Sequence, residues 1–226
     1  MSYQSDIKKH LSDYKRMVFA GFPNGFWIRS KPPKMLTYAF LPKDEDENLI
    51  KYYQNDFLKS HFNVTIKRHM YFHHMNSSQA MCINFFFPLF NELQLDLVLE
   101  FLGFHSDRVD YKTVAFEKES HIDKKANYRP TNFDFYFETE SGKKFYFEIK
   151  YTEQEFGKAP ADKDHINKYR SIYSKHLSLI DPMYQNQKEF LDNYQLMRNI
   201  IHVDKDSYVI FIYPRDNKRI KLGASN

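Results

Sequence analysis

The chain is poor in cysteine, glycine and tryptophan, with one cysteine, six glycines and one tryptophan in 226 residues. The single Cys82 excludes an internal disulfide and any cysteine-based metal motif. Because Cys82 lies among apolar residues, we expect a small buried side chain. So few glycines favour compact elements over long flexible loops. A reducing cytoplasm is the simplest location for such a chain.

Several motifs and segments are also missing. No run of about 18 apolar residues occurs, so we expect no membrane span. The first ten residues, MSYQSDIKKH, lack a hydrophobic signal core. The chain has no glycine-rich phosphate loop, no nucleophile elbow and no zinc-binding helix motif, which removes the common ATPase, hydrolase and metalloprotease interpretations.

Aromatic residues, by contrast, are abundant at 18%, with 22 Phe and 17 Tyr. Most fall at spacings typical of a core, so we expect packing more often than stacking on bases. The net charge of +4 tolerates nucleic acid as a partner but does not demand it. Residues 1–75 hold 12 Lys/Arg against 7 Asp/Glu, which a solvated surface explains about as well as a DNA path does.

Two runs, 133–138 and 145–150, alternate strictly between apolar and polar side chains. The apolar positions are Phe133, Phe135, Phe137, Phe145, Phe147 and Ile149. Strict alternation predicts half-buried strands that keep these six side chains on one face. Glu140, Ser141 and Gly142 separate the runs, so we expect a β-hairpin.

The register of this hairpin follows from the parity of its faces. A two-residue turn at Ser141-Gly142 would put Asp134 opposite Ile149 and mix apolar with polar residues. A three-residue loop with Gly142 in the left-handed conformation keeps the faces apart. That register pairs Thr139 with Lys143, Tyr136 with Tyr146 and Asp134 with Glu148.

Asp134, Glu148 and Lys150 then lie together on one face. Opposed positions have Cβ atoms roughly 4.5–5.5 Å apart, where like charges are destabilising. Asp is also a poor strand former, so Asp134 in mid-strand needs a reason. A bound divalent metal supplies one; the alternative is an ordinary hairpin with a solvated charged face.

Asp134 followed by Glu148-Ile149-Lys150 resembles the signature of the PD-(D/E)XK nuclease superfamily, the restriction-endonuclease-like fold. Phe133 occupies the position of the Pro in that name, and Pro130 stands four residues before Asp134. The segments 77–89 and 193–199 are also similar to a little-characterised bacterial subgroup of the superfamily. The resemblance covers the chain from about residue 70 onward.

The resemblance implies phosphodiester hydrolysis by a metal-activated water. Asp134, Glu148 and the Ile149 backbone carbonyl would bind Mg²⁺, for which Mn²⁺ can substitute. Lys150 would orient the nucleophile, stabilise negative charge or act as a base. These alternatives stay open, as does the choice between one metal and two.

Further candidates have weaker support. Glu117, at the end of a predicted strand, and Glu92 or Glu100, on the predicted helix before it, are candidate additional metal ligands. Gln79 near a helix start would bind a phosphate or a backbone group. One helix face, at positions i, i+3 and i+4, carries Gln195, Arg198 and Asn199. This face would contact nucleic acid or be merely solvated. For the histidines His69, His73 and His74 we expect structural or surface roles.

The order of predicted elements indicates the fold class. Expected helices, in chain order, lie near 7–18, 49–61, 78–87, 92–102, 162–179 and 182–201; residues 21–42 are expected to be an irregular connector. Expected strands lie at 111–117, in the hairpin, and at 208–213, the last with cover on both faces. Helix, three strands, helices and a strand is the core order of the nuclease fold. We therefore expect an α+β protein with a mixed central sheet flanked by helices, in which residues 71–226 form the nuclease-like domain and residues 1–70 a mostly helical extension packed on it.

The sequence thus predicts a cytoplasmic Mg²⁺-dependent endonuclease that acts on DNA, with no membrane partner. By analogy with restriction enzymes, a homodimer is one arrangement for cutting two strands. Two alternatives stay open: a nonenzymatic nucleic-acid- or protein-binding module that retains the fold, and an RNA or structure-specific nuclease.

Overall fold

The computed structural model describes residues 2–124, 130–178 and 180–220. In these residues no helix has both the length and the apolar character needed to cross a membrane. The chain forms two compact units. Unit 1 comprises the described residues of Met1–Leu95, Ile149–Gln154 and Tyr213–Leu222, and unit 2 those of Asp96–Glu148 and Glu155–Ile212. This division differs from the boundary at residue 70, which stays a prediction.

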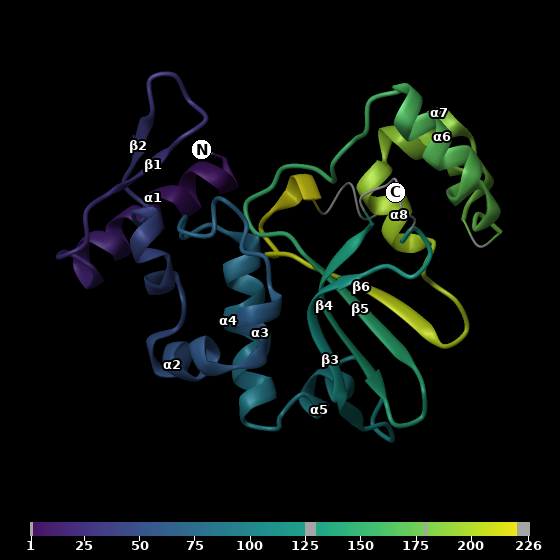
Figure 1. Ribbon diagram of the computed structural model, residues 1–226, viewed down its shortest axis with the longest axis horizontal. Helices are drawn as coiled ribbons and strands as arrows, with labels where there is room; N and C mark the ends of the chain where they lie inside the picture. Colours follow the sequence, from purple (N-terminus) through teal and green to yellow (C-terminus); the bar gives the residue numbers. More distant parts are fainter. Residues whose placement is uncertain (1, 125–129, 179, 221–226) are drawn as a thin grey trace. The chain divides into compact units, whose positions relative to one another are not determined.

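Unit 1 is mostly helical, with one small hairpin (Figure 1). Its elements are α1 (Tyr3–Val18), β1 (Gly25–Trp27), β2 (Lys34–Leu36), η1 (Pro42–Asn48), α2 (Lys51–Lys59), α3 (His61–Thr65) and α4 (Ser78–Asn91). The core contains fully buried aromatic side chains from several of these segments, among them Phe40, Phe57, Phe62, Phe72 and Phe86. These five Phe side chains thus serve as packing, as expected from their spacing.

Two expectations for unit 1 are wrong. The segment expected to be an irregular connector contains the antiparallel pair β1–β2, in which Phe26 pairs with Met35. The helix expected to end before Pro88 continues to Asn91. Proline removes only one helical donor, and the last turn still closes, because the Glu92 N–H donates to the carbonyls of Pro88 and Phe90.

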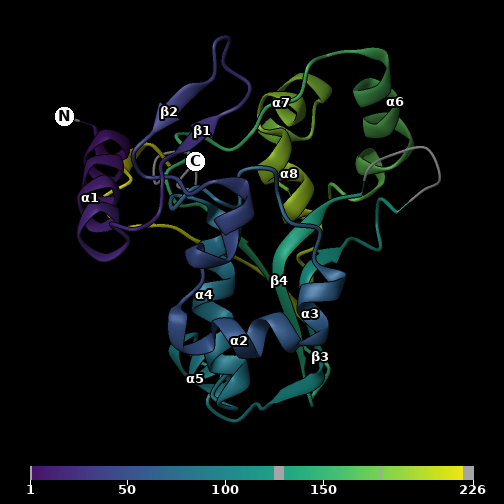
Figure 2. The same cartoon turned by 60° about the vertical axis from the view of Figure 1, so that its left-hand side comes forward.

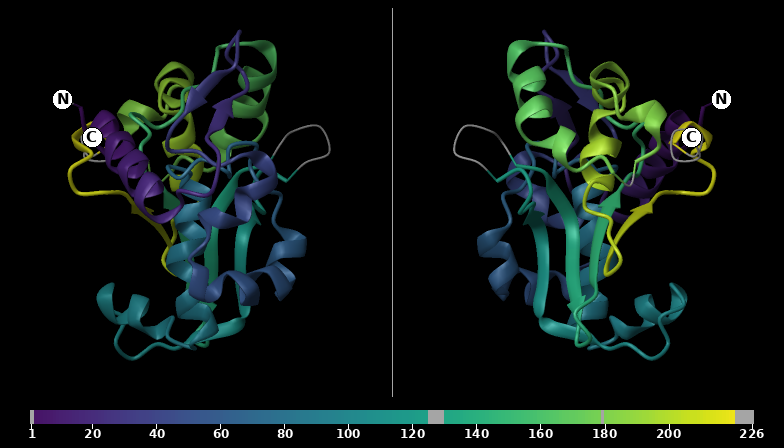
Figure 3. Two further views of the ribbon diagram at one scale, coloured as in Figure 1. Left: turned by 90° about the vertical axis from the view of Figure 1, so that its left-hand side faces the viewer. Right: turned by 90° about the vertical axis from the view of Figure 1, so that its right-hand side faces the viewer.

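Unit 2 is built on a four-stranded sheet in the order β3-β4-β5-β6 (Figures 1 and 3). Its elements are α5 (Asp96–Phe101), β3 (Val109–Glu119), β4 (Asn132–Thr139), β5 (Lys144–Ile149), α6 (Lys163–Ser171), η2 (Tyr173–Lys175), η3 (Pro182–Tyr184), α7 (Gln187–Asp192), α8 (Tyr194–Ile200) and β6 (Ser207–Ile212). Strand β4 is antiparallel to both of its neighbours, β3 and β5.

Strand β6 lies beside β5 with both strands starting at the same end. Lys144 N–H donates to the Asp206 carbonyl at 2.7 Å, and the rings of Phe145 and Tyr208 stack at 5.0 Å. The two strands are therefore parallel and the sheet is mixed. This order, with helices between β5 and β6, confirms the predicted α+β class.

Strand β6 and the segment 182–201 differ from expectation. Strand β6 is half-buried along most of its length because it lies at the edge of the sheet. The helix expected over 182–201 is three short helices. Asn186 caps the start of α7 by accepting from the Glu189 N–H. Asn193 ends α7, because its backbone angles are not helical. The predicted end of the preceding helix, Leu179, lies outside the described residues.

Candidate active site

The β4–β5 hairpin has the predicted register and turn. Tyr136 pairs with Tyr146, and the Thr139 N–H donates to the Lys143 carbonyl at 2.8 Å. Gly142 adopts φ +87°, and its N–H donates back to the Thr139 carbonyl at 2.9 Å. The three-residue loop is therefore closed by a left-handed glycine, as expected for this turn.

The same register brings Asp134 and Glu148 to adjacent strands. The paired residues of β4 and β5 end at Phe135 with Phe147. One further step in this register sets Asp134 opposite Glu148. Asp134 is half-buried, and Glu148 is only 4% exposed. Burial of Glu148 rules out the alternative of a fully solvated charged face on this hairpin.

Phe133 breaks the predicted alternation. Its ring belongs to the cluster of Tyr136 and Tyr146, whereas Phe135 packs against Phe147 on the other face. The expectation that all six apolar side chains share one face is therefore wrong for Phe133. Asp134 stands at the residue where the alternation changes.

Strand β3 has an unusual backbone conformation at the same level of the sheet. Phe116 and Lys118 pair with Phe135 and Phe133, so Glu117 between them lies across from Asp134. Glu117 has φ 53°, a left-handed conformation that is uncommon for a residue with a side chain. Past this residue, the Lys118 ammonium lies 4.5 Å from the centre of the Tyr136 ring. The irregular backbone of β3 thus accompanies the break in β4.

Glu117 has a polar neighbour on β4. The Asn132 Nδ2 donates to the Glu117 carboxylate at 3.4 Å, while Asn132 Oδ1 is a buried acceptor with no hydrogen-bond partner. Three carboxylates, those of Glu117, Asp134 and Glu148, therefore come from adjacent positions on three strands. Among the described residues, however, no group of three or more His, Cys, Asp or Glu is arranged to hold a metal.

Two amides of α8 hold the Glu148 carboxylate. Gln195 Nε2 donates to Glu148 Oε1 at 2.6 Å, and Asn199 Nδ2 donates to Oε2 at 3.2 Å. Gln195 is further fixed by the Gly157 N–H, which donates to its Oε1 at 3.2 Å. These hydrogen bonds fix the orientation of the Glu148 carboxylate.

This arrangement gives two α8 residues a partner that the sequence did not predict. For Gln195 and Asn199 we expected a contact with nucleic acid or a solvated face, and the amides of both donate to Glu148. Asn199 is only 1% exposed and is thus inaccessible to a phosphate. Gln195 shares a helix face with Arg198 and with Asn199, whereas Arg198 and Asn199 point apart because they are adjacent in the helix. Sequence spacing alone contains no signal for a partner 47 or 51 residues away.

Arg198 retains unused donor capacity. Its guanidinium lies 5.3 Å from the centre of the Tyr194 ring, and its Nε is buried without a hydrogen-bond partner. Asn199 Oδ1 is likewise buried and without a partner. The predicted contact of Arg198 with a phosphate stays a prediction.

Ile149 and Lys150 follow Glu148 directly. Ile149 ends β5 and belongs, with Lys150, to the segment that clusters with unit 1. Lys150 is 6% exposed, so its ammonium is buried. Chain geometry alone keeps the Cα atoms of Glu148 and Lys150 within roughly 7 Å. Burial of an ammonium is costly unless an opposite charge or hydrogen bonds compensate for the lost water.

A buried ion pair between Asp123 and Lys168 is linked to α8 through Tyr173. Asp123 Oδ2 accepts from Lys168 Nζ at 2.9 Å and from the Tyr173 hydroxyl at 2.8 Å. Although burial raises the pKa of Asp123, hydrogen bonds from Thr131, Lys168 and Tyr173 lower it well below its usual range. The Tyr173 hydroxyl also lies 3.3 Å from that of Tyr194 on α8. The network therefore supports the helix that holds Glu148, and no sequence motif pointed to it.

The other candidate residues lie in different surroundings. Glu92 is the C-cap of α4 rather than part of a helix before β3. Burial, followed by the neighbouring Glu92 carboxylate, raises the pKa of Tyr53. Glu100 is exposed on α5. The proposed ligand role of each stays a prediction, and the helix assignment of Glu92 was wrong.

Gln79 and the histidines take structural roles in unit 1. Gln79 Oε1 accepts from the His69 N–H at 2.7 Å, and its Nε2 donates to the Lys67 carbonyl at 3.2 Å. The amide thus binds backbone groups, which is one of the two expected roles. His73 and His74 are buried, and burial lowers the pKa of His74 to about 4.

A family model described as "Restriction Endonuclease associating with ARP" matches residues 22–226. No curated protein and no solved structure matches the chain.

Proposed function

The chain belongs to the family of restriction endonucleases associating with ARP, and from this premise we propose that it is a divalent-metal-dependent endonuclease that hydrolyses phosphodiester bonds of DNA. The observation that carries the proposal is the Glu148 carboxylate. It is buried, oriented by two amides of α8, and carried by the strand that pairs with the strand of Asp134. A carboxylate held in this way is prepared for a cation.

The chemistry of the donor set suits a hard cation. Asp134, Glu148 and the Ile149 carbonyl would supply oxygen ligands, which Mg²⁺ and Mn²⁺ prefer over nitrogen and sulfur. When bound, such an ion lowers the pKa of a water molecule and stabilises negative charge on the scissile phosphate. The unpartnered oxygens of Asn132 and Asn199 would accept hydrogen bonds from water molecules around this site.

Gln195 and Asn199 act in this proposal as positioning residues. Each donates to one oxygen of Glu148, which orients the carboxylate and leaves further lone pairs on both oxygens as acceptors. Partners of this kind that orient metal ligands typically affect metal affinity or activity by about 10–100-fold.

Lys150 and Arg198 supply positive charge. Lys150, two residues after Glu148, would orient the attacking water and stabilise the charge that develops on the phosphate. With a depressed pKa it would serve as the base instead. Arg198, with an unpartnered Nε, would bind a phosphate oxygen next to the cleaved bond.

Plasmid cleavage tests the proposal. Purified protein is incubated with supercoiled plasmid in Mg²⁺, Mn²⁺ or EDTA, beside Asp134→Ala, Lys150→Ala and Gln195→Ala. We expect cutting only with a metal, loss of at least about 100-fold in the first two variants, and roughly tenfold in Gln195→Ala, with a higher Mn²⁺ requirement.

Glu140→Gln is the matched control, because Glu140 is an exposed acid in the loop of the same hairpin. It should cut like the unaltered protein. Cutting that survives Asp134→Ala would assign the activity to another site or a contaminant. Parallel reactions with single-stranded DNA and RNA distinguish a structure-specific or RNA nuclease.

A nonenzymatic nucleic-acid-binding module is the second candidate. It is favoured by the absence, among the described residues, of a group of three or more metal-binding side chains. DNA binding without cutting on any of these substrates would support it. Cross-linking of the purified protein checks the homodimer expected by analogy with restriction enzymes.

A further inference from the structure

The segment 14–43 of unit 1 carries positive charge without any acid. Its six cations are Lys15, Arg16, Arg29, Lys31, Lys34 and Lys43, and it contains no Asp or Glu. The hairpin β1–β2 lies in the middle of this segment and extends away from the helices of unit 1 (Figures 1 and 2). Three of the cations, Arg29, Lys31 and Lys34, belong to the hairpin and its tip.

The hairpin is exposed although it is rich in apolar side chains. Residues 26–29 and 31–35 are all exposed, and the exposed fractions are 46% for Trp27, 51% for Ile28 and 57% for Met35. Phe26 pairs with Met35, and Trp27 pairs with Lys34. Each face of the two-stranded ribbon therefore presents an aromatic side chain. On one face, Trp27 lies beside the cation Lys34.

The cations of the hairpin have no acidic partner. No carboxylate in the described chain lies within 4.0 Å of the charged groups of Arg29, Lys31 or Lys34, since none of them is in an ion pair. Another cation lies nearby instead. Burial, followed by the charge of Lys34, lowers the pKa of Lys8. This surface thus attracts anions.

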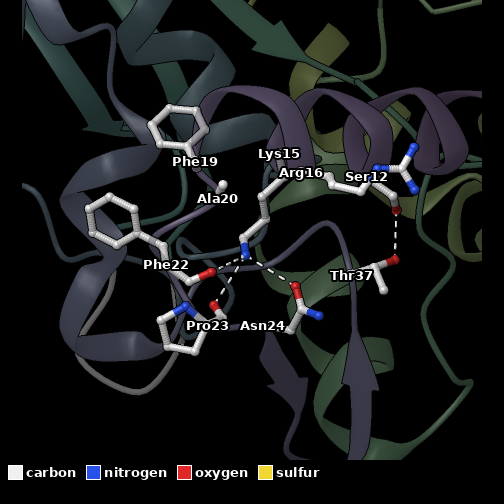
Figure 4. A pocket seen from close by; sticks show the side chains of 9 residues that line it. All are labelled: Ser12, Lys15, Arg16, Phe19, Ala20, Phe22, Pro23, Asn24 and Thr37. Atoms are coloured by element: carbon white, nitrogen blue, oxygen red, sulfur yellow. Dashed lines mark hydrogen bonds between the residues drawn. The ribbon is translucent and has the colours of Figure 1, made fainter.

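The base of the hairpin is firmly anchored. Lys15, 2% exposed, donates from Nζ to the Phe22 carbonyl at 3.0 Å, the Pro23 carbonyl at 3.1 Å and Asn24 Oδ1 at 3.1 Å (Figure 4). All three protons of this ammonium are used. The cavity of about 420 Å³ beside it is therefore not a free anion site, and Lys15 instead fixes the chain that enters β1.

Gly25 adds a second anchor. Its N–H donates to the Ala39 carbonyl at 2.8 Å. A Cβ at this position would lie 1.9 Å from the Phe40 carbonyl oxygen, so only glycine allows this close approach. Hence the hairpin leaves the core in one direction, with its exposed side chains held in place.

The tip of the hairpin and its tryptophan are also ordered. Trp27 Nε1 donates to the Tyr71 hydroxyl at 3.1 Å, and the Arg29 guanidinium lies 5.9 Å from the centre of the Tyr71 ring. Ser30 Oγ accepts from the Lys34 N–H at 2.6 Å and donates to the Trp27 carbonyl at 2.8 Å. An oriented indole beside an arginine is the combination that stacks on bases and sugars.

We propose that the β1–β2 hairpin is a nucleic-acid-binding wing, in which Arg29, Lys31 and Lys34 contact backbone phosphates and Trp27 stacks against a sugar or base. The proposal extends the nuclease function proposed above by giving the substrate a second contact outside the carboxylate cluster. The exposed surface of about ten residues is small for a protein partner, which typically contacts about 20–30 residues. Phosphates, in contrast, match its uncompensated charge.

Salt-dependent binding tests the charged contacts. The full chain is titrated with labelled duplex or single-stranded DNA in EDTA, so that binding is measured without cutting. The variant Arg29→Gln/Lys31→Gln/Lys34→Gln should reduce the slope of log K against log salt by about 2 to 3 and weaken binding at least about tenfold. Lys59→Gln/Lys67→Gln/Lys205→Gln removes the same charge from exposed positions elsewhere and should leave the slope unchanged.

Fluorescence tests the stacking contact, since Trp27 is the only tryptophan of the chain. Its emission should be quenched by nucleic acid with the same midpoint as binding, and Trp27→Ala should weaken binding about tenfold. The quenching should persist in Asp134→Ala, where the proposed nuclease activity is lost. The two proposals can therefore fail separately.

Two outcomes would overturn the wing. The first is equal salt slopes for the hairpin variant, the control variant and the unaltered chain, with no quenching. The second is a response of Trp27 emission to anionic phospholipid vesicles but not to DNA or RNA, which would indicate a membrane contact. Quenching with no cutting on any substrate would uphold the wing and reject only the nuclease.

Discussion

A buried histidine shows how single residues in unit 2 are fixed by their neighbours. Ser120 Oγ accepts from the Ile122 N–H at 3.0 Å and lies 2.7 Å from His202 Nε2. His202 Nδ1 lies 3.2 Å from the Asn199 carbonyl. The carbonyl can only accept, so Nδ1 carries the proton and Nε2 accepts from Ser120. The neutral ring is fully satisfied, and protonation would disrupt this arrangement.

This histidine should make stability depend on pH. Burial lowers the pKa of His202 to about 4, against about 6.5 in an unfolded chain. Between these values the unfolded chain binds the additional proton, so stability rises with pH. About 3 kcal/mol should be lost from pH 7 to pH 4 through this group. Urea unfolding of His202→Gln should show a shallower dependence over that window.

The exposed His105 offers the control for this experiment. His105→Gln should follow the pH dependence of the unaltered protein. An identical dependence in the His202 variant would show that other groups, such as His74 with its similarly lowered pKa, account for the effect.

Individual site residues were predictable only where a local pattern constrained them. Asp134 and Glu148 were found from alternation and turn length, which depend on neighbours in sequence. Gln195 and Asn199 were singled out by helical spacing, but their hydrogen bonds to Glu148 were not predicted. Helical spacing tells which side chains share a face and does not tell what that face meets.

At the scale of elements, the turn of the β4–β5 hairpin depends on one glycine. Gly142 has φ +87°, and a Cβ added there would meet no atom within 4 Å. A side chain at this position would therefore be disfavoured by the left-handed backbone conformation and not by a steric clash with other residues. A residue with a Cβ in this region costs about 1–2 kcal/mol. Gly142→Ala should therefore lower the free energy of unfolding by about that amount, measured in urea.

Gly21 provides the comparison, since a Cβ there also meets nothing within 4 Å and no left-handed φ is required. Gly21→Ala should be neutral or stabilise by up to about 1 kcal/mol. Equal effects of the two substitutions would contradict the assigned role of the Gly142 conformation.

Elements were predictable to different degrees. The β4–β5 hairpin and the order of strands along the chain were predicted correctly, because alternation with a period of two is a strong local signal. The β1–β2 hairpin was missed, since its three-residue strands are too short to show a period. The region 182–201 was expected as one helix, but Asn186 and Asn193 divide it by capping and terminating α7.

At the scale of the whole molecule, a buried ion pair should govern the global stability of unit 2. Asp123 and Lys168 are 0% and 4% exposed and join α6 to the segment before β4. Removal of one member leaves a buried charge without its partner, which costs about 3–5 kcal/mol. Asp123→Asn should lower the free energy of urea unfolding by that amount.

Asp192→Asn is the matched control in the same unit, because its ion pair with Lys188 is exposed and therefore contributes little to stability. The double variant Asp123→Asn/Lys168→Met should recover much of the lost stability, since it also removes the unpaired ammonium. No difference between the Asp123 and Asp192 variants would show that the buried pair contributes little.

The sequence by itself determined the β4–β5 hairpin, its register and the placement of Asp134 and Glu148 on adjacent strands, because side-chain parity and a left-handed glycine act over a few residues. Only the tertiary structure decided what surrounds them. The amides that hold Glu148, the ion pair of Asp123 with Lys168 and the exposed wing at Trp27 join or separate residues far apart in the chain. Such contacts are set by packing between elements, and no local pattern records them.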